Sequence, residues 1–137
     1  MAQMDASSQV AQLIQQAGEA QKKLETYDQV AVDELVIAAA WALINPVNNQ
    51  KLSELAVAET GLGNVADKIT KNHRKTLGLL RDLKEAKTVG VINRDPKNGI
   101  VEIARPVGIV GAIVPSTNPV ATPMNMILNA LKCRNAI

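Results

Sequence analysis

Aromatic residues are scarce in this sequence, which has one Trp, one Tyr and no Phe among its 137 residues. Proteins that bind single-stranded nucleic acids stack bases on aromatic side chains, so nucleic-acid binding is not expected. The sequence also has a single Cys, which rules out an internal disulfide and is typical of a reducing cytoplasm, the location that we expect. The single His, His73, lies far from Cys133 in the sequence, so no metal site is expected.

Long hydrophobic runs are also missing. The longest run, from Val107 to Pro115, is far shorter than the roughly 20 residues that cross a bilayer, so no membrane span is expected. Met1 to Asp5 lacks the basic residues of a signal peptide. The sequence does contain an uneven charge: residues 1–60 hold three Lys and Arg against eight Asp and Glu, and residues 61–137 hold twelve against five. The basic part either attracts an anionic ligand or is an ordinary solvated surface.

Hydrophobic residues recur at helical spacing in four segments, which predict helices over about residues 10–24, 30–44, 46–59 and 65–86. Asn45 before Pro46 is typical of a helix start, and Asn64 with Asp67 three positions later resembles a capping pair. The second of these segments is apolar on nearly all sides. This pattern favours burial from several directions, with Trp41 in the core or at an interface.

The hydrophobic period changes to β-branched runs after Lys87. Thr88–Ile92 and Ile100–Ile103 are predicted to pair as a β-hairpin, because the turn between them contains the pair Asn98-Gly99. The two strands alternate weakly between apolar and polar residues, as expected of an antiparallel ribbon with one solvent-exposed face.

The last third of the sequence contains a strand, a small polar turn and a helix in succession. Val107–Val114 does not alternate, which is typical of a parallel strand buried on both faces, and Pro123–Cys133 is predicted to be helical. Backbone N–H groups gather where the carboxyl end of such a strand meets a helix, and nucleotides bind there. We therefore expect the chemistry at Ser116, Thr117 and Asn118.

The residues Pro115-Ser116-Thr117-Asn118-Pro119 resemble the strand end of the CoA-acylating branch of the aldehyde dehydrogenase superfamily, which includes acetaldehyde, propionaldehyde and sulfoacetaldehyde dehydrogenases. Most other members carry Pro-Trp-Asn-x-Pro or Pro-Phe-Asn-x-Pro there. The stretch Glu59–Ile69, with Lys71-Asn72-His73 close behind, is similar to the same branch. The likeness extends from about Val10 to Ile137.

The resemblance implies an α/β fold: amino-terminal helices, a β-hairpin and the first strand–helix unit of a Rossmann-like parallel sheet, incomplete in this chain. Residues 1–137 would form the amino-terminal part of the NAD-binding domain. Residues 87–104 would belong to the hairpin through which subunits of a homo-oligomer pair. The next buried strand, the catalytic Cys and the residues that hold the adenosine ribose are expected beyond Ile137.

The activity that the resemblance implies is NAD(P)-dependent, CoA-acylating oxidation of an aldehyde through a cysteine thiohemiacetal. NAD or NADP is the expected cofactor and coenzyme A the co-substrate, with sulfoacetaldehyde as the favoured aldehyde. Without a suitably placed nucleophile, the 137-residue chain alone is expected to be inactive. The alternative is a non-catalytic assembly or interaction module, in which the helices and the hairpin form subunit contacts.

The resemblance also assigns roles to the turn. The main chain from Val114 through Pro115 and Ser116 to Thr117 would lie against the nicotinamide cofactor. Asn118 or Thr117 would donate a hydrogen bond to the thiohemiacetal alkoxide. A gapless alignment places Thr117 where most of the family carries its Asn and shifts Asn118 by one position, so both residues are candidates. Asn118 also fits a plain Asn-Pro turn without a catalytic role.

Cys133 is not expected to be the nucleophile. It ends the final predicted helix, where the negative end of the helix dipole disfavours a thiolate. We expect Cys133 to be a packing residue and His73 to be an ordinary surface residue.

Overall fold

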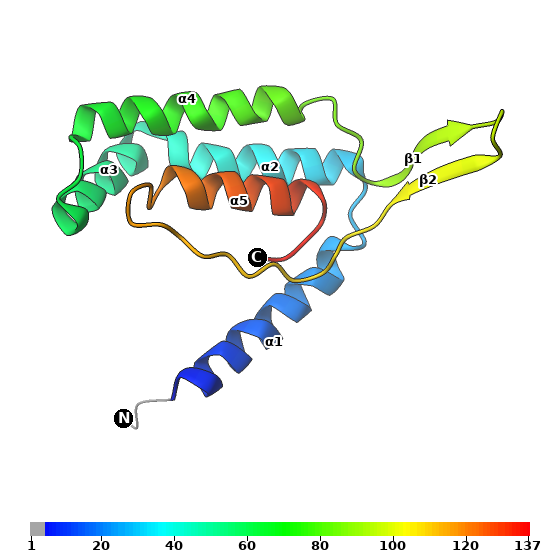
Figure 1. Cartoon of the computed structure of the whole chain (residues 1–137), viewed down its shortest axis with the longest axis horizontal. Coiled ribbons are helices and arrows are strands. Elements are labelled where there is room, and N and C mark those ends of the chain that lie inside the picture. Colours follow the sequence, from blue (N-terminus) through cyan, green and yellow to red (C-terminus); the bar gives the residue numbers. More distant parts are fainter. Residues whose placement is uncertain (1–4) are drawn as a thin grey trace.

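The computed structural model describes residues 5–137 and is built mainly of helices (Figure 1). Met1–Met4, part of the segment considered for a signal peptide, lie outside the described residues. The elements in chain order are α1 (Ala6–Leu24), α2 (Gln29–Ile44), α3 (Pro46–Thr60), α4 (Val65–Leu83), β1 (Gly90–Asp95), β2 (Ile100–Ala104) and α5 (Ala121–Lys132). In Figure 1, α2, α4 and α5 run side by side, while α1 and the hairpin project from this body in different directions.

The first four helices form close to where the sequence predicts them, although α1 begins earlier, at Ala6, and α4 ends earlier, at Leu83; the predicted caps Asn45 and Asn64 are present. The Oδ1 atom of Asn45 accepts a hydrogen bond from the backbone N–H of Val47 at 3.0 Å. The Oδ1 atom of Asn64 accepts one from the N–H of Asp67 at 2.9 Å. Gly61 ends α3 with a φ of 65°, a left-handed conformation that costs Gly little. These local signals fix where α3 and α4 begin and where α3 ends.

The core lies where α2 meets α4 and α5, and it centres on Val36, Ala40 and Leu128. The prediction that α2 is buried from several sides is wrong. Ile37 is exposed, and so is Trp41, with 58% of its surface accessible. The described neighbours cover only part of the circumference of α2, so its remaining apolar residues face outward. Trp41 is therefore not a core residue, and its place at an interface stays a prediction.

A buried polar cluster joins α3 to α4. The Nδ2 atom of Asn72 donates to Oδ1 of Asn49 at 2.9 Å and to Oγ of Ser53 at 3.2 Å. The Nδ2 atom of Asn49 in turn donates to the carbonyl oxygen of Ile69 at 3.1 Å. Buried amides are costly without partners, so a cluster that satisfies them favours one relative position of the two helices.

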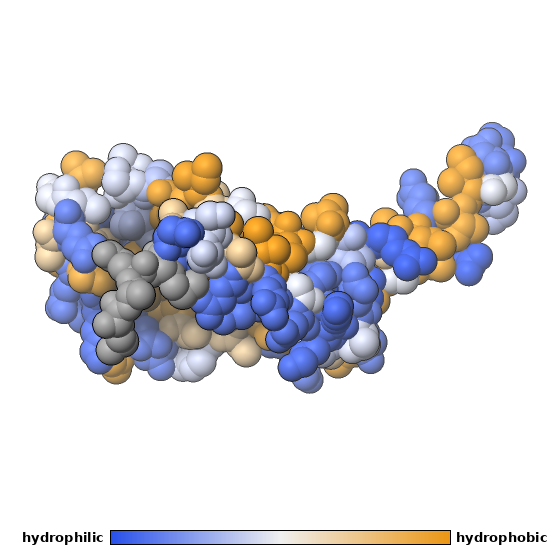
Figure 2. All heavy atoms as spheres, turned by 90° about the horizontal axis from the view of Figure 1, so that it is seen from below, coloured by the Kyte–Doolittle hydropathy of each residue, from blue (hydrophilic) through white to orange (hydrophobic). Residues whose placement is uncertain are grey.

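The predicted hairpin is confirmed. β1 and β2 pair antiparallel from Gly90 opposite Ala104 to Asp95 opposite Ile100. Gly99 closes the turn with a φ of 67°. Figure 2 shows hydrophobic surface running along this projecting arm. The large apolar residues exposed on it are Val91, Ile92, Ile100, Val101 and Ile103.

The predicted strand Val107–Val114 is not formed as a buried strand. Within residues 5–137, this segment forms a single β-bridge, which pairs Ile109 with Ala136 in parallel. Val107 is 84% exposed and Ile113 is 89% exposed. A strand needs a neighbouring strand for its hydrogen bonds, and here Ala136 and the residues beside it are the sole neighbour. The segment therefore runs as an open, apolar stretch of chain across the surface.

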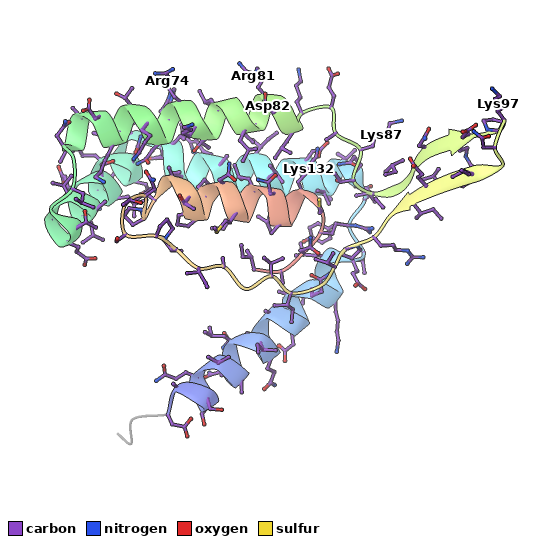
Figure 3. The ribbon with its side chains drawn as sticks, in the orientation of Figure 1. Arg74, Arg81, Asp82, Lys87, Lys97 and Lys132 are labelled. Atoms are coloured by element: carbon purple, nitrogen blue, oxygen red, sulfur yellow. The ribbon has the colours of Figure 1, made fainter. Side chains whose placement is uncertain are left out.

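The segments before and after the hairpin are both hydrogen-bonded to residues at the carboxyl end of α5 or just beyond it. The hydroxyl of Thr88 donates to the carbonyl oxygen of Lys132. On the other leg, the N–H of Val107 donates to Oδ1 of Asn135 at 2.7 Å. Lys132, which is labelled in Figure 3, is buried. Its Nζ atom donates to Oδ1 of Asp33 in α2 at 2.6 Å. The direction of the hairpin is thus tied to α5 and, through α5, to α2.

No single helix among the described residues has both the length and the apolar composition to cross a membrane. α2 and α3 meet that test by length and composition only as a pair, and they are bent by 60° at the break between them.

Candidate active-site turn

The segment from Pro115 to Asn118 forms a turn that leads into α5. The N–H of Asn118 donates to the carbonyl oxygen of Pro115 at 3.3 Å, and the N–H of Thr122 donates to the carbonyl oxygen of Asn118 at 3.3 Å. α5 begins at Ala121, two residues before its predicted start, and no side chain caps it. The carbonyl of Asn118 thus takes part in the first turn of the helix, which fixes the residue close to the helix start.

The side chain of Asn118 is held by a lysine from a different helix. The Nζ atom of Lys71, in α4, donates to Oδ1 of Asn118 at 2.6 Å. Both residues are half-buried. This contact joins residues 47 positions apart in the sequence, so it connects the turn to α4. A hydrogen bond from a charged donor is stronger than one between neutral groups.

Thr117 has different surroundings. It is exposed, and its side chain makes no hydrogen bond within residues 5–137. It lines a shallow pocket of about 160 Å³ between the turn and the beginning of α4. The other lining residues are Leu62, Gly63, Asn64, Asp67, Lys68 and Lys71. Lys68 is only 6% exposed, so two lysines of α4 lie beside the turn.

The predicted cofactor segment offers exposed main chain. Val114, Pro115, Ser116 and Thr117 are all exposed, and within residues 5–137 the N–H groups of Val114, Ser116 and Thr117 have no hydrogen-bond partner. Free backbone donors next to small side chains suit an anionic ligand laid along the chain. The residues present therefore fit one side of a dinucleotide site.

The basic residues of α4 also line a groove of about 640 Å³ between α4 and α5. Arg74 and Lys75 are exposed there, and Arg74 projects from α4 in Figure 3. Two acids, Asp67 and Asp82, line the same groove. The two carboxylates offset part of the positive charge that the lysines and the arginine bring to the groove.

Cys133 and His73 lie apart from the turn. Cys133, which was expected to be a packing residue, is exposed. It follows the last residue of α5, at the opposite end of that helix from Asn118. His73 is exposed, as predicted. Within residues 5–137, no group of three or more His, Cys, Asp and Glu side chains is placed to hold a metal ion.

The structure therefore brings Thr117 and Asn118 together with Lys68 and Lys71, two residues to which the sequence analysis gave no role. A signal was present, because Lys71 lies in the run Lys71-Asn72-His73 that carries the family resemblance. Its contact with Asn118 was not predictable, since nothing local in either segment indicates which helix faces the turn.

The sequence matches the aldehyde dehydrogenase family over residues 1–137, and the chain belongs to that family. Its relatives include the acylating sulfoacetaldehyde dehydrogenase of Cupriavidus necator, which is 60% identical over 96% of this chain and 27% of the relative. The acetylating succinate-semialdehyde dehydrogenase of Clostridium kluyveri is 41% identical over 93% of this chain and 28% of the relative.

A solved structure gives the same result for the fold. An acetylating aldehyde dehydrogenase from Geobacillus thermoglucosidasius superposes with a TM-score of 0.90 at 43% identity, covering 95% of this chain and 28% of that one. The helices and the hairpin are thus those of an aldehyde dehydrogenase. The chain spans little more than a quarter of the length of these relatives.

Proposed function

We propose that this chain is the amino-terminal part of the NAD-binding domain of an NAD(P)-dependent, CoA-acylating aldehyde dehydrogenase that acts in the cytoplasm. The observation that supports this most is the turn at Pro115–Asn118, with a free main chain on one side and an anchored amide on the other. The names of the relatives agree, because they describe acylating and acetylating aldehyde dehydrogenases.

In this proposal the turn has two tasks. The main chain of Val114–Thr117 holds the nicotinamide cofactor, which supplies the hydride acceptor when it is bound. Asn118, or Thr117 beside it, donates a hydrogen bond to the oxygen that becomes negative when a cysteine thiolate outside this chain attacks the aldehyde. A pre-placed donor lowers the barrier because it does not need to reorganise as the charge develops. Loss of a hydride to the nicotinamide would leave an acyl group on the cysteine sulfur, and this group would then pass to the thiol of coenzyme A and free the thiolate.

Sulfoacetaldehyde is the substrate that we propose. This preference is supported by the 60% identity to the relative from Cupriavidus necator, against 41% to the relative named for succinate semialdehyde.

A second, non-catalytic role is supported by the hairpin. Its arm stands away from the helices and exposes large apolar residues on both strands, including Val91 and Ile103. Apolar surface of this kind marks an interaction site. We propose that residues 87–104 form a contact between subunits of a homo-oligomer.

The experiment is a turnover assay on the full-length polypeptide that contains these residues. Sulfoacetaldehyde, succinate semialdehyde and acetaldehyde are each supplied with NAD or NADP, with and without coenzyme A. We expect CoA-dependent formation of reduced cofactor, highest kcat/KM with sulfoacetaldehyde, and an acyl-CoA product in mass spectrometry. A free acid formed without coenzyme A would contradict the acylating function. The 137-residue chain alone serves as the inactive control.

A further inference from the structure

The contact between Lys71 and Asn118 determines which way the Asn118 amide faces. A lysine ammonium has three donors and no acceptor. Only the oxygen of an amide accepts a hydrogen bond from it, so Oδ1 is the atom that faces Lys71, at 2.6 Å from Nζ. The two hydrogens on Nδ2 then point away from Lys71. Without this lysine the two ends of the amide are nearly equal in shape, and the amide is free to turn by 180°.

The residues next to Lys71 fix its place on α4 and leave its ammonium group free to bond Asn118. Asn72, the next residue, is buried and hydrogen-bonded to α3 through Asn49 and Ser53, which fixes this turn of α4. Asp67, one helical turn before Lys71, is the nearest acid on the helix. Its Oδ2 atom accepts a hydrogen bond from Nδ2 of Asn64 at 2.6 Å, and Lys71 is not paired with it. The ammonium is therefore available to Asn118.

We infer that Lys71 is a positioning residue for the reaction: it holds the Asn118 amide with its N–H groups toward the substrate oxygen. This inference rests on the proposed function. The charge of Lys71 adds to the effect, because a cation bonded to the carbonyl end of an amide polarises it and makes its N–H groups better donors. Lys71 thus acts through Asn118 and need not touch the substrate.

The test is a double-mutant cycle in the full-length enzyme. Lys71→Met removes the donor and keeps much of the length of the side chain, and Asn118→Ala removes the amide. We expect Lys71→Met alone to lower kcat on the order of tenfold, less than the loss of an entire oxyanion donor, with the KM for the cofactor unchanged. In the Asn118→Ala background, Lys71→Met should change kcat by less than about twofold, because its effect requires the amide.

Two further variants make the test specific. Lys71→Arg keeps a cationic donor and should retain more of the rate than Lys71→Met. Lys75→Met is the matched control: Lys75 lies four positions along α4, is exposed, and makes no side-chain hydrogen bond or ion pair within residues 5–137. It should leave kcat unchanged.

The unmodified enzyme, the Lys71→Met and Asn118→Ala variants and the double variant should also be compared by thermal unfolding, which does not depend on turnover. If the double variant is destabilised by less than the sum of the two single variants, the contact between Lys71 and Asn118 is supported. If the losses of stability are additive, the contact is overturned. If Lys71→Met lowered kcat by the same factor in the unmodified enzyme and in the Asn118→Ala variant, the positioning role would be overturned while the contact between the two side chains would stand. If the unmodified enzyme forms no acyl-CoA, the proposed function fails and the inference falls with it.

Discussion

Asn118 and Thr117 are neighbours in the turn, but the structure fixes their side chains to different degrees. Asn118 is half-buried and its amide is fixed by Lys71. Thr117 is exposed, and within residues 5–137 its hydroxyl has no partner that sets its direction. A donor stabilises a developing charge best when its orientation is fixed before the reaction. This difference favours Asn118 as the oxyanion donor, although a gapless alignment favours Thr117.

We therefore expect Asn118→Ala in the full-length enzyme to lower kcat on the order of 10²-fold, the usual effect of removing one oxyanion donor. The affinity for NAD should change little, because the proposed cofactor contact is made by the main chain before Asn118. Steady-state kinetics and a cofactor titration measure the two quantities separately.

Thr117→Val is the paired control for this substitution. It removes the hydroxyl and keeps the shape of the side chain, so we expect kcat to fall by less than about threefold. A large loss confined to the Thr117 variant would assign the oxyanion contact to Thr117.

At the scale of single elements, the hairpin turn has a titratable group that stabilises it. The side chain and then the backbone N–H of Asn98 donate to the Asp95 carboxylate and lower its pKa below the ordinary value of 3.8. A carboxyl group with a lowered pKa in the folded state stabilises that state above its ordinary pKa. This stabilisation is lost as the pH falls from that ordinary value through the lowered one.

Asp95→Asn should accordingly loosen the turn at neutral pH and have less effect at a pH low enough to protonate Asp95 in the folded state. The backbone amide signals of Lys97 and Asn98 in NMR report on the turn at each pH. Glu102→Gln, an exposed acid on β2, is the control and should leave the turn unchanged at both pH values. An equal effect of Asp95→Asn at neutral and acid pH would show that the charge is not what stabilises the turn.

The elements that the sequence predicts well are those that depend on neighbouring residues. Asn45, Asn64 and Gly61 act within one helical turn of their own position, and the Asn98-Gly99 pair acts within its own hairpin. The strand at Val107–Val114 depends instead on partners distant in the sequence, and the described residues supply one bridge. For the same reason, hydrophobicity alone did not show that Trp41 faces outward, or that Lys71 reaches Asn118.

At the scale of the whole molecule, much apolar surface lies outside the core. The open segment with Val107 and Ile113 crosses the surface, and the hairpin exposes a further set of apolar residues. An apolar groove of about 570 Å³ lies between α1 and residues 109–112, with Leu13 and Ile14 on its α1 side. Free strand edges and apolar patches of this kind promote association.

The 137-residue chain should therefore form oligomers or aggregates at micromolar concentration in sedimentation velocity experiments. Replacing the cross-strand neighbours Val91 and Ile103 together by Thr keeps the preference for a strand, removes apolar surface, and should shift the distribution toward smaller species. Lys97→Thr, in the polar turn, is the control and should not. A stable monomer of the unmodified chain that melts cooperatively would contradict this prediction.

The position of α5 couples the arm of the molecule to the turn. Asn118 lies just before its first residue, and both legs of the hairpin are bonded to residues at or just after its last. With 12 residues, α5 is about 18 Å long, so a tilt of about 5° at one end moves the other by about 1.5 Å. Displacements of this size at a reacting group can cost on the order of 100-fold in rate. Binding of a neighbouring molecule to the hairpin would therefore shift, through α5, the orientation of the Asn118 amide at the other end of that helix.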